Sequence, residues 1–576
     1  MSRVATFLFS LFTFLYFCSL LWLTAGVPLV FTSPDENANF TFASTIAATG
    51  DVRIADDINL ALNGIVHPRS TVVLGALTLP GSFLGWPIVV GVIGTVAAGS
   101  PYVMLLVTPI LVMLALAAWW GIARKFGDDR FAWIATVLLA LHPAFWYYAA
   151  RGMMHNVPFV CLLILGAWLM VKSKVGKSES RKEQIVISSF LHLSISGLLI
   201  GLALCIRVNE AIWVLPLAIF LLWKVRGERS LVASGRLAAA FLFCASLPLV
   251  GLGAVNTHLY GSPFATGYTV EDGGSVGQEL GGSEEEVTDL LTSRPADQLS
   301  TIARALLPFG FHPRAMLKNV WHYGVALFPW MTLLAIIGIA TVILMSVATK
   351  DPIDEVPRYT RDDKERAWIV LTWVTLGLAL WLGIVYGSWS FNDNPDPTAI
   401  TIGDSHLRYW LPLFVLSTLF GARAVASLER KEKSEKRKVA AWLPSAIIVS
   451  AIAILSGVLV FGGDDGLLRT RQVLFESAAK RDAIIAVTED SAIIVVDRAD
   501  KFLFPHRRVI QPLRSDATYA VLADAVKLAP LYYYGIPFPD VDMTYLNDVK
   551  LAALGLRIDA VTAIGDETLY RISPSL

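Results

Sequence analysis

Long apolar runs recur along most of the chain, and polar segments separate them. A helix of about 20 apolar residues is long enough to cross the roughly 30 Å of hydrocarbon in a bilayer. The pattern predicts membrane-spanning helices at residues 7–31, 101–123, 131–148, 155–172, 187–206, 210–224, 237–255, 320–346, 367–387, 408–428 and 440–461. The predicted fold is therefore an all-α polytopic membrane protein with about eleven transmembrane helices.

Two N-terminal segments allow more than one interpretation. The run at 7–31 is either a secretory signal peptide or the first transmembrane helix, and its length and the many spans after it favour an uncleaved helix. The Gly- and Pro-containing segment at 71–99 is expected to be an amphipathic or re-entrant segment at the membrane interface, or else a pair of short spans.

The pattern changes near residue 462. The runs at 492–497 and 508–510 are typical of buried strands, whereas 519–528 and 546–554 have helical patterns. This mixture predicts a small α/β domain at 462–576, after a transmembrane module at 1–461.

Composition agrees with a membrane protein. Hydrophobic residues make up 55% of the chain and charged residues 16%, and the mean hydropathy is +0.59. The formal net charge is zero, so no overall field favours nucleic acid as a partner. All four cysteines fall inside apolar runs, and no His/Cys cluster has the spacing of a zinc site, so no metal ligands are predicted.

Basic residues indicate the orientation. Lys and Arg concentrate in one set of loops, at 123–125, 172–182, 224–236, 350–366 and 430–438. Cytoplasmic loops carry such an excess, so the N-terminus is expected in the cytoplasm. The loops at 32–100, 256–319 and 388–407 are then external, and an odd number of spans also places the C-terminal domain outside. The predicted location is the plasma membrane, in a multi-pass arrangement.

An acidic pair follows the first apolar run directly, in the sequence Ser33-Pro34-Asp35-Glu36. Proline stops a helix, so both carboxylates are expected at the outer membrane surface. Two roles are open for them. They are either acidic residues that favour the N-terminus of a following helix through its dipole, or groups that react with a lipid-linked substrate at this depth.

A first external loop that opens with Asp-Glu is similar to that of the GT-C membrane glycosyltransferases. The branch it most resembles contains the protein O-mannosyltransferases (glycosyltransferase family 39) and the lipid A aminoarabinose transferases. Further short segments follow in the matching order over about residues 5–425: His67-Pro68, Gly85-Trp86-Pro87, Gly99-Ser100-Pro101, residues 256–268 and Arg408-Tyr409-Trp410-Leu411-Pro412.

This resemblance implies transfer of a sugar from a polyprenyl-phosphate carrier to an acceptor outside the cytoplasm. It implies that Asp35 is the general base for the acceptor hydroxyl and that Glu36 assists it. The departing phosphate needs positive partners in a site of low dielectric constant. The candidate substrate-binding residues are His67, Arg69, Arg151, His155, Arg207, Asp404, His406 and Arg408.

Structural roles are the alternatives for some of these residues. An arginine at a membrane boundary, such as Arg207, often anchors a span, and the segment Gly403-Asp404-Ser405-His406 fits an Asx turn ahead of a helix. Many relatives carry a second acidic residue in the next external loop, whereas residues 151–156 here contain none. This departure leaves open both the acceptor class and the use of a divalent cation.

The predicted function is thus a hexosyl- or pentosyltransferase of the cell envelope. Its partners are the lipid-linked sugar donor, a glycan, lipid or protein acceptor, and the bilayer. One alternative is a transporter or flippase for a lipid-linked or small substrate, although neither inverted repeats nor charges near the middle of the spans are visible. The other is a non-catalytic assembly or sensor protein that acts through its C-terminal domain.

Overall fold

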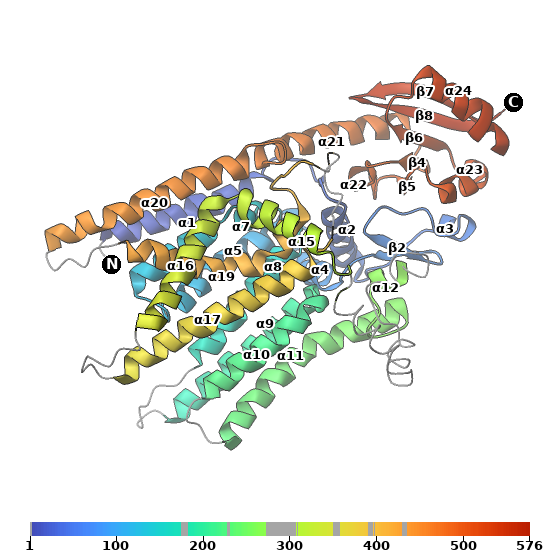
Figure 1. Ribbon diagram of the computed structural model, residues 1–576. Helices are drawn as coiled ribbons and strands as arrows, with labels where there is room; N and C mark the ends of the chain where they lie inside the picture. Colours follow the sequence, from blue (N-terminus) through green and yellow to red (C-terminus); the bar gives the residue numbers. More distant parts are fainter. Residues whose placement is uncertain are drawn as a thin grey trace. The chain divides into compact units, whose positions relative to one another are not determined.

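The computed structural model describes residues 3–575 except 174–181, 227–230, 272–306, 308, 349–357, 390–395, 397 and 429–434. Each predicted span contains a helix or a helix pair, although the first helix is shorter than its predicted span (Figure 1). These helices are α1 (Arg3–Trp22), α5 (Pro101–Ala123), α6 (Asp129–Ala140) with α7 (Pro143–Ala149), α8 (Asn156–Lys172), α9 (Lys182–Ile206), α10 (Ala211–Arg226), α11 (Leu231–Tyr260), η5 (Val320–Ala326) with α16 (Pro329–Ala348), α17 (Arg358–Val385), α19 (Leu411–Ser427) and α20 (Glu435–Phe461).

The chain is a multi-pass membrane protein, but the predicted number of spans is not confirmed. Among the described residues, five helices are long and apolar enough to cross a membrane, or up to seven segments if each of two bent helix pairs is one span. The bend between α6 and α7 is 61°, and the bend before α16 is 95°. Pro143 and Pro329 begin the second helix of these pairs, where a missing backbone N–H breaks the helical hydrogen-bond ladder. The helices α8 and α19 are apolar but have only 17 residues each.

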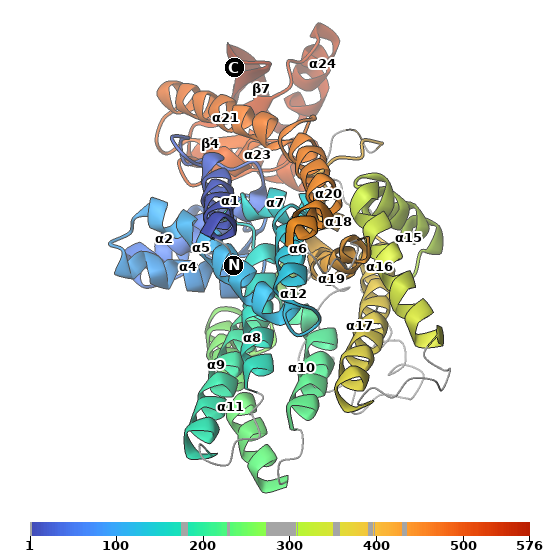
Figure 2. The same cartoon turned by 90° about the vertical axis from the view of Figure 1, so that its left-hand side faces the viewer.

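Close packing of small residues joins some of these helices. The helices α8 and α9 lie side by side (Figure 2). A Cβ atom at Gly166 would lie 2.7 Å from Cγ1 of Ile200, and the Ser196 hydroxyl donates to the Gly166 carbonyl at 2.8 Å. Small residues and interhelical hydrogen bonds are the usual means of helix association in lipid, where the hydrophobic effect gives no driving force.

The N-terminal half of the chain departs from prediction at two points. Helix α1 ends at Trp22 instead of reaching residue 31, and Gly26 just beyond it has a φ of 69°. Between 71 and 99, the strands β2 (Thr71–Leu74) and β3 (Leu77–Pro80) form an antiparallel hairpin before α4 (Gly85–Val96). Neither interpretation of this segment included the strands. The hairpin also pairs with β1 (Ile54–Ala55) to give a three-stranded sheet.

The predicted α/β region is confirmed after α21 (Leu467–Val487). The strands β4 (Ile493–Val496) and β5 (Arg508–Ile510) lie where the sequence placed them, and α23 (Asp516–Leu528), η6 (Leu546–Lys550) and η7 (Ala552–Leu554) cover the helical patterns. The sequence did not predict β6 (Leu531–Gly535), β7 (Leu556–Ile564) and β8 (Glu567–Pro574). The sheet order is β5-β4-β6-β8-β7, parallel from β5 to β6 and antiparallel from there to β7.

The structure forms two compact units, and both are discontinuous in sequence. The helix unit comprises Met1–Trp22, Leu106–Ala254 and Glu284–Arg469, and the sheet unit comprises Leu23–Leu105, Val255–Ser283 and Thr470–Leu576. The first loop, predicted as part of the transmembrane module, therefore lies in the same unit as the C-terminal region. The division of the sequence at residue 462 stays a prediction.

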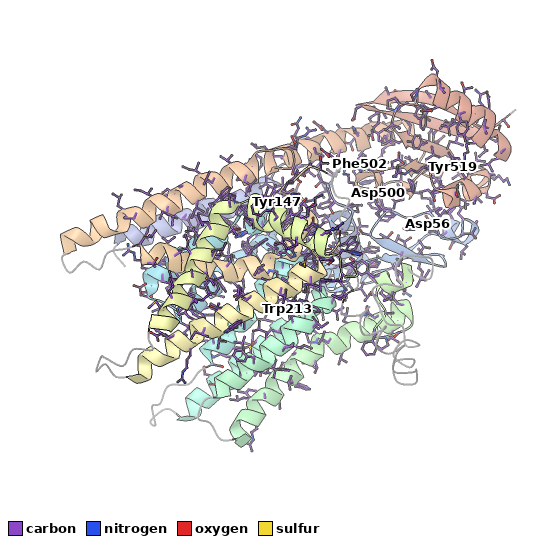
Figure 3. All side chains as sticks on the ribbon, viewed as in Figure 1. Asp56, Tyr147, Trp213, Asp500, Phe502 and Tyr519 are labelled. Carbon is purple, nitrogen blue, oxygen red and sulfur yellow. The ribbon has the colours of Figure 1, made fainter. Side chains whose placement is uncertain are left out.

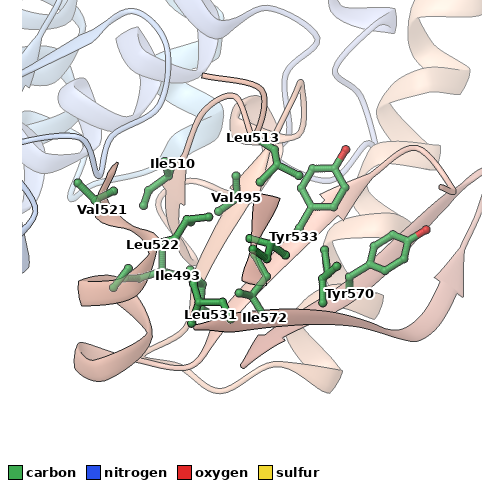
Figure 4. Packing of buried hydrophobic residues seen from close by; sticks show 14 of the residues in the cluster. Ile493, Val495, Ile510, Leu513, Val521, Leu522, Leu531, Tyr533, Tyr570 and Ile572 are labelled. Atoms are coloured by element: carbon green, nitrogen blue, oxygen red, sulfur yellow. The ribbon is translucent and has the colours of Figure 1, made fainter. Parts of the chain in front are cut away.

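The first loop contributes side chains to the core of the C-terminal sheet (Figure 4 shows part of this core). Leu62 and Val66 belong to the same buried cluster as Ile493 and Leu522. The side chain of Asn59 fixes the loop conformation, because it donates to the Val66 carbonyl at 3.1 Å and accepts from the Val66 amide at 3.0 Å. A hydrophobic core thus joins segments that are more than 400 residues apart.

We expect the variant Leu62→Ala to lower the free energy of unfolding of the sheet unit by about 2–5 kcal/mol, because it opens a cavity in this core. Leu60 is the matched control, since it is two residues away and 64% exposed. Thermal unfolding of the purified protein in detergent should show a lower melting temperature for Leu62→Ala and little change for Leu60→Ala. Equal melting temperatures for the two variants would contradict the shared core.

Candidate functional site

The acidic pair lies in the first turn of helix α2 (Pro34–Thr49), which begins at Pro34 after the N-cap residue Ser33. The prediction of acidic residues at a helix N-terminus is therefore confirmed, and the helix dipole stabilises both negative charges. Asp35 is partly exposed, whereas Glu36 is buried with 4% of its surface exposed. A helix-terminal position and a chemical role are compatible, because a carboxylate held this way keeps its acceptor oxygens.

Ser70 is a direct partner of Asp35. Its hydroxyl donates to Oδ1 of Asp35 at 2.6 Å, and its backbone has a φ of 61° in the left-handed region. The Ser70 carbonyl accepts from the Gly81 amide at 2.9 Å. A Cβ atom at Gly81 would lie 2.8 Å from the backbone of Ser70 and Thr71, so this close approach requires glycine.

Arg69 forms an ion pair with Asp500, a residue labelled in Figure 3 that begins α22 (Asp500–Leu503). Its Nη2 lies 2.6 Å from Oδ1 of Asp500, and its Nε and its backbone nitrogen each lie 3.0 Å from Oδ2. Asp500 is fully buried. The charge of Arg69 is therefore largely compensated by Asp500. Arg69 is for this reason a weaker candidate for binding a phosphate than the sequence indicated.

His67 is held by its own loop. Its Nδ1 lies 3.0 Å from the Pro68 carbonyl and 3.2 Å from the Thr71 hydroxyl oxygen, so Nδ1 carries the proton of the neutral ring. Burial lowers the pKa of His67, although the Pro68 carbonyl and Asp500 partly oppose this shift. The imidazole is consequently neutral at pH 7 and offers a hydrogen bond there instead of a positive charge.

In the helix unit, Arg207 and Glu210 form a buried ion pair at the break between α9 and α10. Glu210 ends the short helix η2 (Val208–Glu210), and Arg207 precedes it. The Arg207 Nη2 donates to Oε1 of Glu210 at 2.7 Å and to the Tyr386 hydroxyl at 2.9 Å. The Tyr386 hydroxyl itself donates to Glu210 at 2.7 Å, and the Trp213 indole donates to its other oxygen. Both charged side chains are only 4% exposed. Arg207 therefore does more than anchor a span at the membrane surface.

Aromatic rings surround this pair. The Arg207 guanidinium lies 4.6 Å from the centre of the Tyr409 ring, which stacks on Tyr386 with the centroids 4.5 Å apart. Its Nη1 also lies 3.4 Å from Nε2 of His155, which comes from the loop between α7 and α8. His155 is 5% exposed, so this predicted site residue does contact another one.

The segment around Asp404 forms the Asx-type turn that was open from the sequence. Asp404 is the N-cap of α18 (Ser405–Tyr409), and its Oδ1 accepts from the His406 amide at 2.9 Å. The same oxygen lies 2.7 Å from Nδ1 of His406, whose Nε2 lies 3.2 Å from the Trp389 carbonyl. His406 also stacks on Tyr323 with centroids 5.0 Å apart. These contacts fix the ring of a buried histidine.

The remaining two arginines contact soft or aromatic groups. The Arg408 Nη1 lies 3.4 Å from the sulfur of Met154, and its guanidinium lies 5.2 Å from the centre of the Tyr409 ring. Arg151 is 7% exposed, and its Nη1 lies 3.5 Å from the hydroxyl of Tyr147, a residue labelled in Figure 3.

The predicted site residues thus fall into two sets. Asp35, Glu36, His67 and Arg69 belong to the sheet unit, and Arg151, His155, Arg207, Asp404, His406 and Arg408 belong to the helix unit. Sequence reasoning missed Ser70, Asp500, Trp213 and Tyr386. Trp213 had a visible signal, because it lies three residues after Glu210 and shares a helix face with it. Asp500 had none, since 431 residues separate it from Arg69.

Comparison with known proteins supports the resemblance. The family model described as dolichyl-phosphate-mannose-protein mannosyltransferase matches residues 89–250. The archaeal oligosaccharyltransferase AglB from Archaeoglobus fulgidus, in complex with an inhibitory peptide and a dolichol-phosphate, superposes with a TM-score of 0.54. The identity is 12%, over 96% of this chain and 71% of that one. ArnT from Cupriavidus metallidurans bound to undecaprenyl phosphate also gives a TM-score of 0.54 and 12% identity, over 99% of this chain and 98% of that one.

The chain has the GT-C fold. The resemblance to GT-C membrane glycosyltransferases that the sequence indicated is thereby confirmed. No curated protein matches this chain in sequence. The family match covers α5 to α10, most of α11 and the Arg207–Glu210 pair of this GT-C protein, but it does not reach Asp35 on one side or Arg408 on the other.

We expect Glu210→Gln to destabilise the GT-C fold by about 3–5 kcal/mol, because it leaves the Arg207 charge buried without a counter-charge. Glu476 on α21 is the control, since it is exposed, and Glu476→Gln should change stability by less than about 0.5 kcal/mol. Thermal unfolding in detergent compares the two. A melting temperature for Glu210→Gln equal to that of the control would show that the pair contributes nothing to stability.

We also expect the stability of the protein to fall as the pH falls below about 6.5. The folded state holds His67 neutral with a lowered pKa, whereas the unfolded chain takes up a proton below its ordinary value of 6.5. Melting temperatures of wild type and His67→Gln at pH 7.5 and pH 5.5 test this. The variant should lose less stability on acidification, and an equal loss in both proteins would refute the assignment to His67.

Proposed function

We propose that this GT-C protein transfers a sugar from a polyprenyl-phosphate carrier to an acceptor hydroxyl, with Asp35 as the general base. The observation that carries the proposal is the placement of Asp35. It is a partly exposed carboxylate in the first turn of the helix that follows the first apolar helix, and it accepts a hydrogen bond from Ser70. Two structures of the same fold support the choice of donor, because one holds a dolichol-phosphate and the other undecaprenyl phosphate.

The proposed reaction is a displacement at the anomeric carbon. The acceptor oxygen forms a bond to this carbon as its proton passes to the Asp35 carboxylate, and the bond from carbon to phosphate oxygen breaks. The polyprenyl phosphate leaves with the bonding electron pair. A base positioned in this way contributes about 10²–10⁴-fold to a rate. Glu36 is proposed to assist by holding the first turn of α2, since it is buried there.

The leaving phosphate requires positive charge that is not already compensated. Arg69 and Arg207 each bind a buried carboxylate, so they are the weaker candidates. Arg151, Arg408, His155, His406 and Asp404 stay proposed substrate contacts on the strength of the resemblance. Among the described residues, no group of three or more His, Cys, Asp and Glu side chains is placed to hold a metal ion.

The proposal extends to the setting of the reaction. The acceptor is a glycan, lipid or protein on the external face of the plasma membrane, and the transferred group is a hexose or pentose. The N-terminus is proposed to be cytoplasmic and the C-terminal region external. Cysteine accessibility probes at the exposed positions of the sheet unit test this orientation in intact cells.

We expect Asp35→Asn to reduce sugar transfer by about 100-fold or more, because the amide cannot accept the acceptor proton. The assay follows a radiolabelled sugar from a polyprenyl-phosphate donor into product in isolated membranes. Asp51 is the control, because its side chain is 40% exposed and pairs with Arg53 at 2.6 Å, and Asp51→Asn should retain transfer. Full activity of Asp35→Asn would remove Asp35 from the mechanism. Counterflow of substrate in liposomes without a covalent product would favour a transporter instead.

A further inference from the structure

Residues 500–504 of the C-terminal region contact a neighbour of each partner in the Ser70–Asp35 hydrogen bond. Asp500 binds Arg69, which precedes Ser70, and the Phe504 carbonyl accepts from Asn37, two residues after Asp35. We propose that Asp500 is a positioning residue for Asp35, and that it acts through Arg69 and Ser70. This inference rests on the proposed function, because it assigns a purpose to the geometry around the proposed base. It gives the C-terminal region a role in the transfer reaction beyond closing its own core.

Asp500 fixes the main chain as well as the side chain of Arg69. Its two oxygens accept from the Arg69 backbone N–H, from Nε and from Nη2, at 3.0, 3.0 and 2.6 Å. Asp500 is fully buried, so water does not compete for these oxygens. Because Asp500 binds both the backbone and the guanidinium of Arg69, it restricts the position of the backbone that leads into the next residue, Ser70.

Ser70 adopts a conformation that serine rarely takes. Its φ is 61°, and at this angle the Cβ atom of an L-residue lies too close to the following carbonyl oxygen. Glycine has no Cβ atom and adopts the conformation without this cost. A residue persists in such a conformation only where its surroundings impose it. Here two hydrogen bonds fix the backbone on either side. Asp500 accepts from the backbone N–H of Arg69, the residue before Ser70, and the Ser70 carbonyl accepts from the Gly81 amide. What serine provides and glycine lacks is the hydroxyl that donates to Asp35 at 2.6 Å.

The helix that carries the other partner, Asp35, contacts the same segment. Helix α2, which carries Asp35, packs against α22, and Figure 3 labels Asp500 and Phe502 on that helix. The side-chain amide of Asn37, two residues after Asp35, donates to the Phe504 carbonyl at 3.2 Å. Asp500 and Phe504 therefore connect the loop and the helix that meet at the Ser70–Asp35 bond.

The chain offers a matched control for this arrangement. Arg508 pairs with Asp56 through Nε at 2.7 Å and Nη2 at 3.0 Å. This second pair joins the same two regions, the first loop and the C-terminal region, with the same chemistry. Asp56 lies fourteen residues before Ser70, so loss of this pair weakens the attachment of the loop without releasing Ser70 directly.

The experiment compares Asp500→Asn, Asp56→Asn, Ser70→Ala and Ser70→Gly in the full-length protein. Transfer is measured from a polyprenyl-phosphate sugar as kcat and as the pH dependence of kcat/KM, with melting temperatures measured in parallel. We expect Asp500→Asn and both Ser70 variants to lower kcat about tenfold or more. The acid limb of the pH–rate profile should move to higher pH, because ionised Asp35 has lost a hydrogen-bond donor.

We expect Asp56→Asn to lower the melting temperature, although by less than Asp500→Asn because Asp56 is partly exposed, with kcat and the acid limb unchanged. Ser70→Gly relieves the backbone strain that Ser70→Ala keeps, so their melting temperatures should differ while their kcat values agree. This comparison tests the Ser70–Asp35 contact even if Asp500→Asn fails to fold.

Several results would overturn the inference. These are an unchanged kcat and acid limb in Asp500→Asn or in the Ser70 variants, or the same loss of kcat in Asp56→Asn as in Asp500→Asn. Asp35→Asn separates this failure from failure of the proposed function. An inactive Asp35→Asn with active Asp500 and Ser70 variants refutes only the positioning role, whereas an active Asp35→Asn refutes the proposed base and the positioning role together.

Discussion

The ion pair between Arg69 and Asp500 is the contact on which the arrangement of the sheet unit depends. It joins residues 431 positions apart, and its carboxylate is fully buried. Burying a carboxylate costs free energy unless its oxygens have partners. The position of the segment that carries Asp500 therefore depends on the loop that carries Arg69. The hydrophobic core extends this dependence, because Leu62 and Val66 fill space beside the C-terminal strands.

The helix unit also contains a buried ion pair, in which aromatic side chains supply the additional hydrogen bonds. Arg207 and Glu210 lie where two helices meet, and tyrosine and tryptophan donors complete the coordination of the carboxylate. The aromatic faces around Arg207 offer further stabilisation through cation–π contacts. The hydrogen bonds and ring contacts of this pair thus satisfy its charges at the point where the helical backbone is interrupted.

The helix dipole stabilises a carboxylate at the start of a helix, but neighbouring groups determine how the carboxylate is oriented. Pro34 begins α2 at a defined residue, and Ser70 supplies the donor that orients Asp35. The Ser70 hydroxyl reaches Asp35 while the Ser70 backbone is in the unfavourable left-handed region. The GT-C fold is therefore compatible with a division of labour, in which apolar helices hold the protein in the membrane and the sheet unit orients the proposed base.

The sequence by itself determined the membrane-embedded helices, the buried strands at 492–497 and 508–510, and the acidic pair after the first helix, because each depends on a local pattern of apolar and polar residues. It also indicated the GT-C resemblance through short segments in a fixed order. Only the tertiary structure decided that the first loop shares a core with the C-terminal strands and that Arg69 is paired with Asp500. Contacts between residues hundreds of positions apart leave no periodic signal in one sequence, because either partner alone resembles an ordinary surface charge.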